Sequence, residues 1–215
     1  DVMNRIWDII KSSPNPDDTL FIITSDHGEH LGEKALYGHL LSLYNDLIWV
    51  PLIIKFPKDI NKRGKEDRLV SLNDLYATIL DLVQSPFPCP ETSVSLLRNH
   101  ERDVTLSQHI YPEIFRTTLG AKQEVCRLKG ETFSPAVWAV MTSSGLKAIE
   151  NRDGVIEIYN LQKDAEENHN LAPTMPAEAL ENIRHMIKSL KEETSYQAAL
   201  DEASKLKIPT GLVGV

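Results

Sequence analysis

The chain has 215 residues, of which 41% are hydrophobic and 25% are charged, as in ordinary globular proteins. Its formal net charge of -8 argues against a non-specific nucleic-acid or heparin binder, which needs a basic surface, but is compatible with a local cationic pocket for a small anion. The longest apolar stretch, residues 47–56, contains Pro51 and Lys55 and is too short to span a bilayer. Cys89 and Cys126 show no CxxC or metal-ligand spacing, so they leave the compartment undecided.

The first part of the chain alternates between helical and strand patterns. Residues 2–11 have the apolar spacing of an amphipathic helix. Residues 19–24 and 51–56 are apolar runs typical of parallel strands that are covered on both faces. A further helix is predicted from Ser71, with Asp74 at the capping-box position. Its apolar stripe consists of Leu72, Leu75, Ile79, Leu82 and Val83. The alternation predicts an α/β fold with a mostly parallel sheet and flanking helices.

The pattern changes after the prolines that follow residue 85. Short strands are predicted at residues 103–110, 137–141, 146–149 and 155–161. The last two strands are joined by Asn-Arg-Asp-Gly at residues 151–154, a sequence that favours a hairpin. A final helix is predicted near Pro176 from the spacing of Leu180, Ile183, Ile187 and Leu190. We therefore expect a small antiparallel sheet followed by a C-terminal helix.

These patterns divide the chain into three parts. Residues 1–90 are expected to form part of an α/β core with a metal-binding loop. Residues 91–194 are expected to form the small antiparallel subdomain with its terminal helix, and residues 195–215 a tail.

The candidate site lies directly after the apolar run at residues 19–24, where loops of open α/β sheets bind ligands. Asp26 supplies a carboxylate and His27 an imidazole, and Gly28 allows the sharp turn that lets adjacent residues ligate one ion. An oxygen-rich site with one nitrogen suits calcium best, with magnesium or manganese as alternatives. A solvated loop with an Asx turn is the competing interpretation of Asp-His-Gly alone.

The order of motifs beyond this loop is informative. Asp-His-Gly-Glu is followed by Leu-Gly-Glu, by Gly38-His39, by Tyr44, and then by Val-Pro-Leu-Ile-Ile at residues 50–54. Over residues 19–57 this order resembles the sulfatase family of the alkaline-phosphatase superfamily. Residues 70–83 resemble the family's next helix, and residues 156–172 are similar to its C-terminal signature. The resemblance is to the C-terminal half of the family only.

The resemblance implies roles for particular residues. Asp26 and His27 match the pair that ligates the single divalent cation. His39 matches a Lys or His that contacts the sulfate oxygens, and a protonated imidazole there could stabilise charge on the sulfuryl group and the leaving group. Lys34 is the competing candidate for this contact. Trp49 stands where relatives carry Arg.

The family's nucleophile belongs to a Cys- or Ser-x-Pro-x-Arg motif whose Cys or Ser is oxidised to formylglycine. These 215 residues contain no such motif, and the N-terminal acidic pair of the metal shell has no counterpart either. We therefore expect the formylglycine in an N-terminal half on which this chain depends, weak metal binding by this chain alone, and no turnover.

The expected reaction is hydrolysis of a sulfate ester, on a small molecule or a glycan, by the complete protein. Sister families share the Asp-His-Gly loop, so hydrolysis of phosphodiesters or phosphonate monoesters is the second hypothesis. The third is a non-catalytic interaction domain. Among the other histidines, His30 is expected to face solvent, His109 to be structural, and His100, His169 and His185 to lie at the surface.

Overall fold

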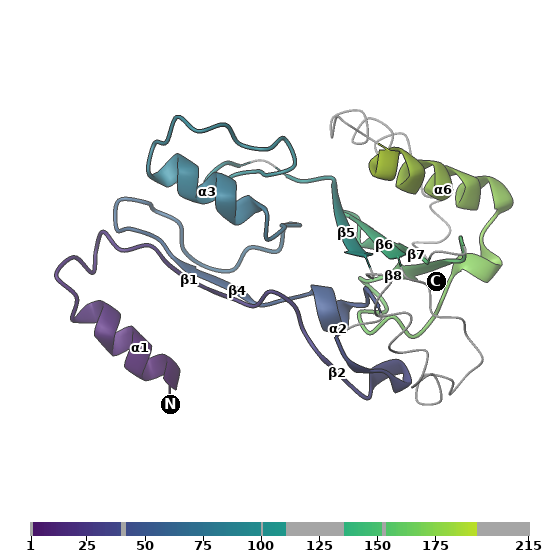
Figure 1. Ribbon diagram of the computed structural model, residues 1–215, viewed down its shortest axis with the longest axis horizontal. Coiled ribbons are helices and arrows are strands. Elements are labelled where there is room, and N and C mark those ends of the chain that lie inside the picture. Colours follow the sequence, from purple (N-terminus) through teal and green to yellow (C-terminus); the bar gives the residue numbers. More distant parts are fainter. Residues whose placement is uncertain (1, 40–41, 100, 111–135, 152–153, 193–215) are drawn as a thin grey trace.

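The computed structural model describes residues 2–39, 42–99, 101–110, 136–151 and 154–192. Along the chain the elements fall into two consecutive parts. The first part contains α1 (Val2–Lys11), β1 (Phe21–Thr24), β2 (His30–Leu31), the 3-10 turn η1 (Glu33–Ala35), β3 (Tyr37–Gly38), α2 (Asn45–Ile48), β4 (Leu52–Lys55) and α3 (Asp74–Leu82). The second part contains β5 (Val104–Ile110), β6 (Ala136–Thr142), β7 (Leu146–Glu150), β8 (Ile156–Asn160), the 3-10 turn η3 (Ala172–Thr174) and α6 (Ala177–Glu192). Figure 1 shows α1, the β1–β4 pair and α3 on one side and the β5–β8 sheet with α6 on the other, with β2 and α2 next to that sheet.

The two apolar runs of the first part pair with each other as an antiparallel ladder. Phe21 lies opposite Lys55, and Thr24 lies opposite Leu52. This pairing corrects the parallel arrangement that the sequence suggested for these two strands. A parallel pair needs a crossover connection, usually a full helix, that returns the chain to the same end of the sheet. The connection here holds only the β2–β3 ribbon and the four-residue α2, and it brings the chain straight back along β1.

The second part is an antiparallel meander in which β5, β6, β7 and β8 are neighbours in chain order. All four predicted strands are confirmed, and each end lies within one residue of its predicted position. The predicted hairpin joins β7 to β8, with Glu150 opposite Ile156. Gly154 in its turn has a φ of 73°, a left-handed conformation that costs glycine little.

The meander is covered on both faces, as the alternation of side chains along its strands requires. One face carries Val140, Ala148 and Ile158 and packs against α6. The α6 side chains that are buried there are Ile183, Met186, Ile187 and Leu190, which confirms the predicted apolar stripe in its central turns.

The opposite face of the meander packs against the described segment of residues 42–48, which we call the arm. Val137, Ala139, Ile149 and Tyr159 form a buried cluster with Leu43 of the arm. The arm runs through α2 and belongs to the first part of the chain. The junction between the two parts is therefore a packed contact between the arm and the C-terminal sheet.

Helix α3 begins at Asp74, three residues after the predicted start at Ser71, and the Ser71 amide donates to the Asp74 carboxylate at 2.8 Å. Its buried side chains are Asp74, Ala77 and Thr78, whereas the predicted apolar stripe is largely exposed, with Ile79 at 42%. Hydrogen bonds explain this orientation. Asp74 also accepts from the Val94 amide at 2.8 Å and pairs with the buried Arg102, so the polar face of the helix is held against the loop that follows it.

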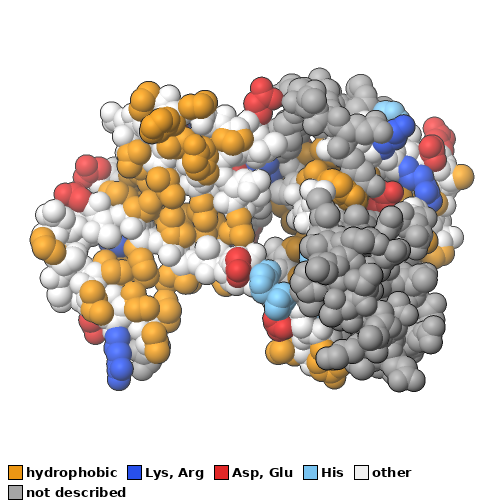
Figure 2. All heavy atoms as spheres, viewed as in Figure 1, with side chains coloured by type: hydrophobic (Ala, Val, Ile, Leu, Met, Phe, Trp, Pro, Cys, Tyr) orange, Lys and Arg blue, Asp and Glu red, His pale blue; other side chains and the backbone are white. Residues whose placement is uncertain are grey.

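Helix α1 packs little against the rest of the described chain. It has no buried residue, and Val2 and Ile9 of its apolar side are 69% and 70% exposed. Figure 2 shows hydrophobic side chains gathered over the part that contains α1, the β1–β4 pair and α3. This part therefore presents an extensive apolar surface.

None of the described helices has the length and hydrophobicity that a bilayer span requires. Residues 195–215, predicted as a tail, and His100 lie outside the described residues. The division of the chain at residue 90 stays a prediction.

Candidate functional site

The Asp-His-Gly loop leaves the end of β1 and enters the junction between the two parts. The Asp26 side chain is 88% exposed, and its Oδ1 accepts the backbone N–H of His27 at 3.0 Å. Backbone hydrogen bonds, first that of His27, hold the pKa of Asp26 below its ordinary value. Asp26 therefore presents an ionised carboxylate at the protein surface.

His27 has one ring nitrogen engaged and the other available. Its Nδ1 donates to the Gly28 carbonyl at 2.7 Å, since a carbonyl can only accept, so in the neutral ring Nε2 carries the lone pair. Nε2 lies 3.8 Å from Oδ2 of Asp26. A carboxylate oxygen and an imidazole lone pair at this separation can reach one divalent cation, so the two residues fit part of a metal shell.

Gly28 brings this loop against the arm. Its N–H donates to the Leu47 carbonyl at 2.8 Å, and a Cβ at residue 28 would lie 1.9 Å from the carbonyl oxygen of Asp46. No larger residue fits without moving one backbone away from the other. Gly28 thus serves the loop in two ways, because it allows the predicted sharp turn and also lets the loop pack closely on α2.

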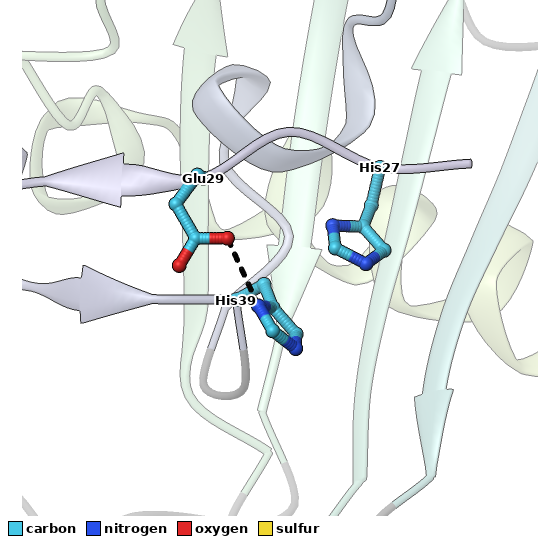
Figure 3. A group of neighbouring side chains, drawn as sticks. All are labelled: His27, Glu29 and His39. Atoms are coloured by element: carbon cyan, nitrogen blue, oxygen red, sulfur yellow. Dashed lines mark hydrogen bonds and ion pairs between the residues drawn. The ribbon is translucent and has the colours of Figure 1, made fainter. Parts of the chain in front are cut away.

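A second group of side chains lies beside the loop. His39 follows β3, and its Nδ1 lies 2.9 Å from Oε2 of Glu29, as Figure 3 shows. The His27 and His39 rings are stacked, with centroids 4.4 Å apart. Ligand atoms of His27, Glu29 and His39 all lie within 4.8 Å of one another, and all three side chains are exposed. The structure thus brings the predicted residues His27 and His39 together, and adds Glu29.

His30 differs from its expectation as a solvent-facing loop residue. It is 2% exposed, and its Nε2 lies 2.6 Å from the Ser42 hydroxyl of the arm. Its Nδ1 faces the Asp46 carboxylate at 3.6 Å. Burial lowers the pKa of His30, although the carboxylates of Asp46 and Glu33 oppose that effect. His30 is therefore a buried link between β2 and the arm.

The side chain of Lys34 is bound by the turn at residues 166–167. Its Nζ donates to the backbone carbonyls of Glu166 and Glu167, at 2.9 Å for Glu166, and lies 4.8 Å from the centre of the Tyr44 ring. Of the two candidates for the sulfate contact, His39 is the one that lies beside His27. Its contact with sulfate stays a prediction.

Several residues of this region went unnoticed in the sequence. Lys147 and Glu167 form an ion pair at 2.6 Å with side chains that are 0% and 1% exposed. The sequence gives Glu29 no role beyond its place in the Asp-His-Gly-Glu motif. Lys147 could have been suspected, because it shares a face of β7 with Ile149 and so faces the covered side of the sheet.

The sequence profile of the sulfatase family matches residues 1–85. The first 85 residues of the chain thus resemble the sulfatase family. Arylsulfatase K of Bos taurus is 24% identical over 190 residues, covering 87% of this chain and 33% of the relative. The sulfatase YidJ of Escherichia coli, itself uncharacterised, is 28% identical over 196 residues, covering 90% of this chain and 34% of the relative. The chain thus spans about a third of the length of these sulfatases.

Solved structures share the fold of this chain. A putative sulfatase of Bacteroides thetaiotaomicron matches with a TM-score of 0.67 at 18% identity, covering 97% of this chain and 43% of that one. The phosphonate monoester hydrolase of Agrobacterium radiobacter matches with a TM-score of 0.67 at 23% identity, covering 88% and 38%. A protein in complex with its substrate D-glucosamine-2-N,6-O-disulfate matches with a TM-score of 0.65 at 18% identity, covering 95% and 38%. The predicted alkaline-phosphatase-like α/β fold is confirmed.

Proposed function

We propose that this chain forms the C-terminal portion of an enzyme that hydrolyses sulfate esters. The observation that carries the proposal is the meeting of Asp26, His27 and His39 at one exposed point of the junction. Figure 2 shows histidine side chains there, beside an acidic side chain, at the surface between the two parts. The match of residues 1–85 to the sulfatase family supports the reaction type.

Asp26 and His27 are the residues that would hold a divalent cation, most suitably calcium. Such an ion would supply positive charge to the oxygens of a bound sulfate. The ionised Asp26 carboxylate and the Nε2 lone pair of His27 are already oriented outward, because their other polar atoms are used by the backbone. We propose that the remaining ligands, and a formylglycine nucleophile, come from residues outside this chain.

His39 is proposed to donate the proton that the leaving alcohol needs. As the ester's sulfur–oxygen bond breaks, the departing alcohol oxygen takes a proton from Nε2 of the protonated ring. Glu29, at 2.9 Å from Nδ1, fixes the orientation of that ring and leaves Nε2 directed away from it. Glu29 is accordingly a positioning residue in this scheme.

The test is hydrolysis of an aryl sulfate by the complete enzyme with Asp26→Asn and His39→Gln, with Asp17→Asn as the control. Asp17 is an exposed carboxylate whose partner is Lys58, outside the site. We expect each site variant to lose about a hundredfold or more in kcat/KM and the control to keep wild-type activity. Wild-type activity in Asp26→Asn would refute the metal role and favour a non-catalytic domain.

A second candidate is hydrolysis of phosphonate monoesters or phosphodiesters. The structural match to a phosphonate monoester hydrolase favours it, as does the 33% identity over 98 residues to a multifunctional alkaline phosphatase superfamily protein of Trinickia caryophylli, which covers 44% of this chain and 19% of that one. Paired assays with the sulfate and phosphonate esters of one phenol separate the two reactions. A larger kcat/KM for the phosphonate would replace the sulfatase proposal.

A further inference from the structure

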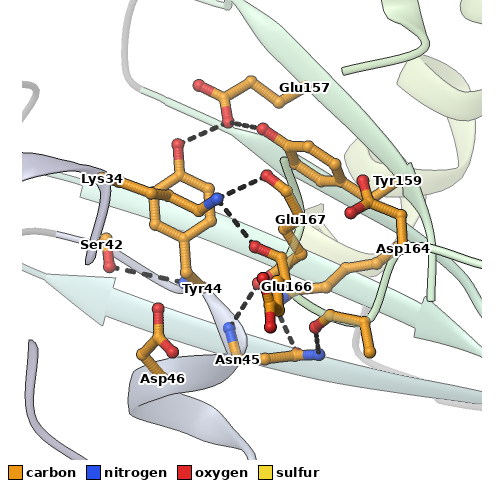
Figure 4. A network of polar contacts seen from close by, with 12 residues as sticks. Lys34, Ser42, Tyr44, Asn45, Asp46, Glu157, Tyr159, Asp164, Glu166 and Glu167 are labelled. Atoms are coloured by element: carbon orange, nitrogen blue, oxygen red, sulfur yellow. Dashed lines mark hydrogen bonds and ion pairs between the residues drawn. The ribbon is translucent and has the colours of Figure 1, made fainter. Parts of the chain in front are cut away.

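A buried polar cluster joins the arm to the C-terminal sheet, and the proposed catalytic roles do not explain it. Lys147 of β7 and Glu167, from the turn after β8, lie side by side beneath the arm. Figure 4 shows Glu167 beside Asn45 of the arm. We call the group formed by Lys147, Glu167 and Asn45 the clamp.

Each member of the clamp binds the other two. The Asn45 backbone N–H donates to Oε2 of Glu167 at 2.6 Å, and Lys147 donates to the side-chain oxygen of Asn45 at 2.9 Å. Lys147 in turn lies 2.6 Å from Oε1 of Glu167. The first residue of α2 is therefore bound through both its backbone and its side chain to groups more than 100 residues later in the sequence.

The turn that supplies Glu167 is itself held in place. The Asp164 carboxylate accepts the N–H groups of Asn168 at 3.0 Å and His169 at 2.8 Å. Glu167 sits in this turn with a φ of 56°, a conformation that side chains other than glycine rarely adopt. A strained, carboxylate-held backbone thus presents one buried carboxylate to the arm.

The clamp reaches the proposed metal loop through a short series of contacts. Glu167 holds Asn45 at the start of α2, and Leu47, two residues on, accepts the N–H of Gly28 at 2.8 Å. Gly28 is adjacent to His27. On the other side, Lys34 is bound to the Glu166 and Glu167 carbonyls, so the hairpin that leads to His39 is attached to the same turn.

The Lys147–Glu167 pair adds little net stability, and its main effect is on the arrangement of the groups around it. Burial lowers the pKa of Lys147 to about 8 despite the opposing attraction of Glu167, so desolvation outweighs the pairing. Buried ion pairs of this kind are often no more stabilising than apolar residues of similar size, but they fix one arrangement of the groups around them.

We propose that Glu167, held by Lys147, is a positioning residue that fixes the arm against the C-terminal sheet and thereby sets the placement of His27 and His39. The expected change in kcat rests on the proposed sulfatase function. The expected change in the ring resonances of His27 and His39 does not depend on that function. Under this proposal the C-terminal sheet helps to position His27 and His39.

The test compares Glu167→Gln, the double variant Lys147→Met/Glu167→Met, and Glu166→Gln in the complete protein. Glu166 is the matched control, because it lies in the same turn but its exposed carboxylate binds only Asn168, at 3.1 Å, among the described side chains. The double variant removes both buried charges, so it avoids the unpaired charge that could unfold the single variant. Three quantities are measured: the ring resonances of His27 and His39, kcat and KM for an aryl sulfate, and the urea midpoint.

We expect the double variant to keep a urea midpoint near that of the wild type, to shift the His27 and His39 resonances, and to lower kcat by about tenfold to a hundredfold with a smaller change in KM. Glu166→Gln should match the wild type in all three. Unchanged ring resonances in a folded double variant would overturn the proposal. If the sulfatase assignment fails instead, Asp26→Asn leaves activity intact while the resonances still report on the clamp.

Discussion

Gly28 allows the site loop to lie directly on the backbone of α2. A Cβ at this position would lie 1.9 Å from the Asp46 carbonyl oxygen, and no left-handed φ is involved. Gly28→Ala should therefore force the loop and the arm apart, at a cost of about 1–3 kcal/mol in unfolding free energy, and should weaken calcium binding measured by titration calorimetry.

Gly154→Ala is the matched control for that change. A Cβ at residue 154 meets nothing within 4 Å, but the φ of 73° is left-handed, so it should cost about 1–2 kcal/mol of stability without touching calcium binding. Equal calcium affinity in the two variants would contradict the close-packing role of Gly28.

His30 predicts a pH dependence of stability. Burial lowers its pKa below the ordinary value of 6.5, so the folded protein holds a neutral ring while the unfolded chain takes up a proton near pH 6.5. The unfolded state then binds more protons below that pH, and the stability associated with the neutral ring is lost as the pH falls. Lys34 acts in the same direction, whereas the carboxylates of Asp46, Glu33 and Glu29 oppose it.

The measurement is urea unfolding of the wild type and His30→Gln between pH 7.5 and pH 5. The stability advantage of the wild type should shrink on acidification, by up to about 1.4 kcal/mol per pH unit. His169→Gln, at a site with an 84% exposed side chain, is the control and should show no such trend. A constant difference between wild type and His30→Gln would exclude a buried neutral ring.

The exposure of a site residue can be predicted from the sequence where it depends on neighbours in the chain. It cannot be predicted where it depends on residues that are distant in the sequence. Asp26 and His27 follow a strand and adjoin a glycine, so their exposure at its end could be anticipated. The burial of His30 depends on Ser42 and Asp46, which reach it only after the chain has turned back. Nothing in the local pattern distinguishes these two kinds of histidine.

At the scale of elements, α6 is the main cover of the C-terminal sheet. Ile187 is fully buried in the cluster that joins helix and sheet. Ile187→Ala should lower the unfolding free energy by about 2–5 kcal/mol, because a cavity adds to the lost burial. Ile9→Ala in α1, at a side chain that is 70% exposed, should change it by less than about 0.5 kcal/mol in urea unfolding of the same chain.

Elements and their types followed from sequence periodicity, whereas their pairing and orientation did not. The strands β6, β7 and β8 are short runs rich in apolar residues, and the sequence located each within about a residue. The β1–β4 pair looked parallel because both runs are apolar on both faces, yet the short connection makes it antiparallel. In α3 the predicted apolar stripe is present but largely exposed. Hydrogen bonds from the Val94 and Leu96 amides to Asp74 and Thr78 hold the polar side of the helix against the following loop.

At the scale of the whole molecule, we expect a substitution in the apolar surface around α1 to have opposite effects in this chain alone and in the complete enzyme. In this chain alone, Ile9→Lys replaces an exposed apolar side chain and should reduce self-association, measured by light scattering. In the complete enzyme that we propose, the same surface is covered, so the lysine should lower the unfolding free energy by about 2 kcal/mol or more.

Val155→Lys is the control, because Val155 is 56% exposed in the second part of the chain. It should be tolerated in both settings. Tolerance of Ile9→Lys in the complete enzyme as well would mean that α1 stays in solvent there.

The clamp also bears on the order in which the molecule folds. Strands β6, β7 and β8 join neighbours in the chain, whereas the arm meets Glu167 across 122 residues and Lys147 across 102. Loops of that length close late, after local hairpins have formed. The amides of Gly28 and Asn45 should therefore exchange with deuterium at lower denaturant than those of β7. The sheet would persist as a scaffold through openings in which the catalytic geometry is transiently lost.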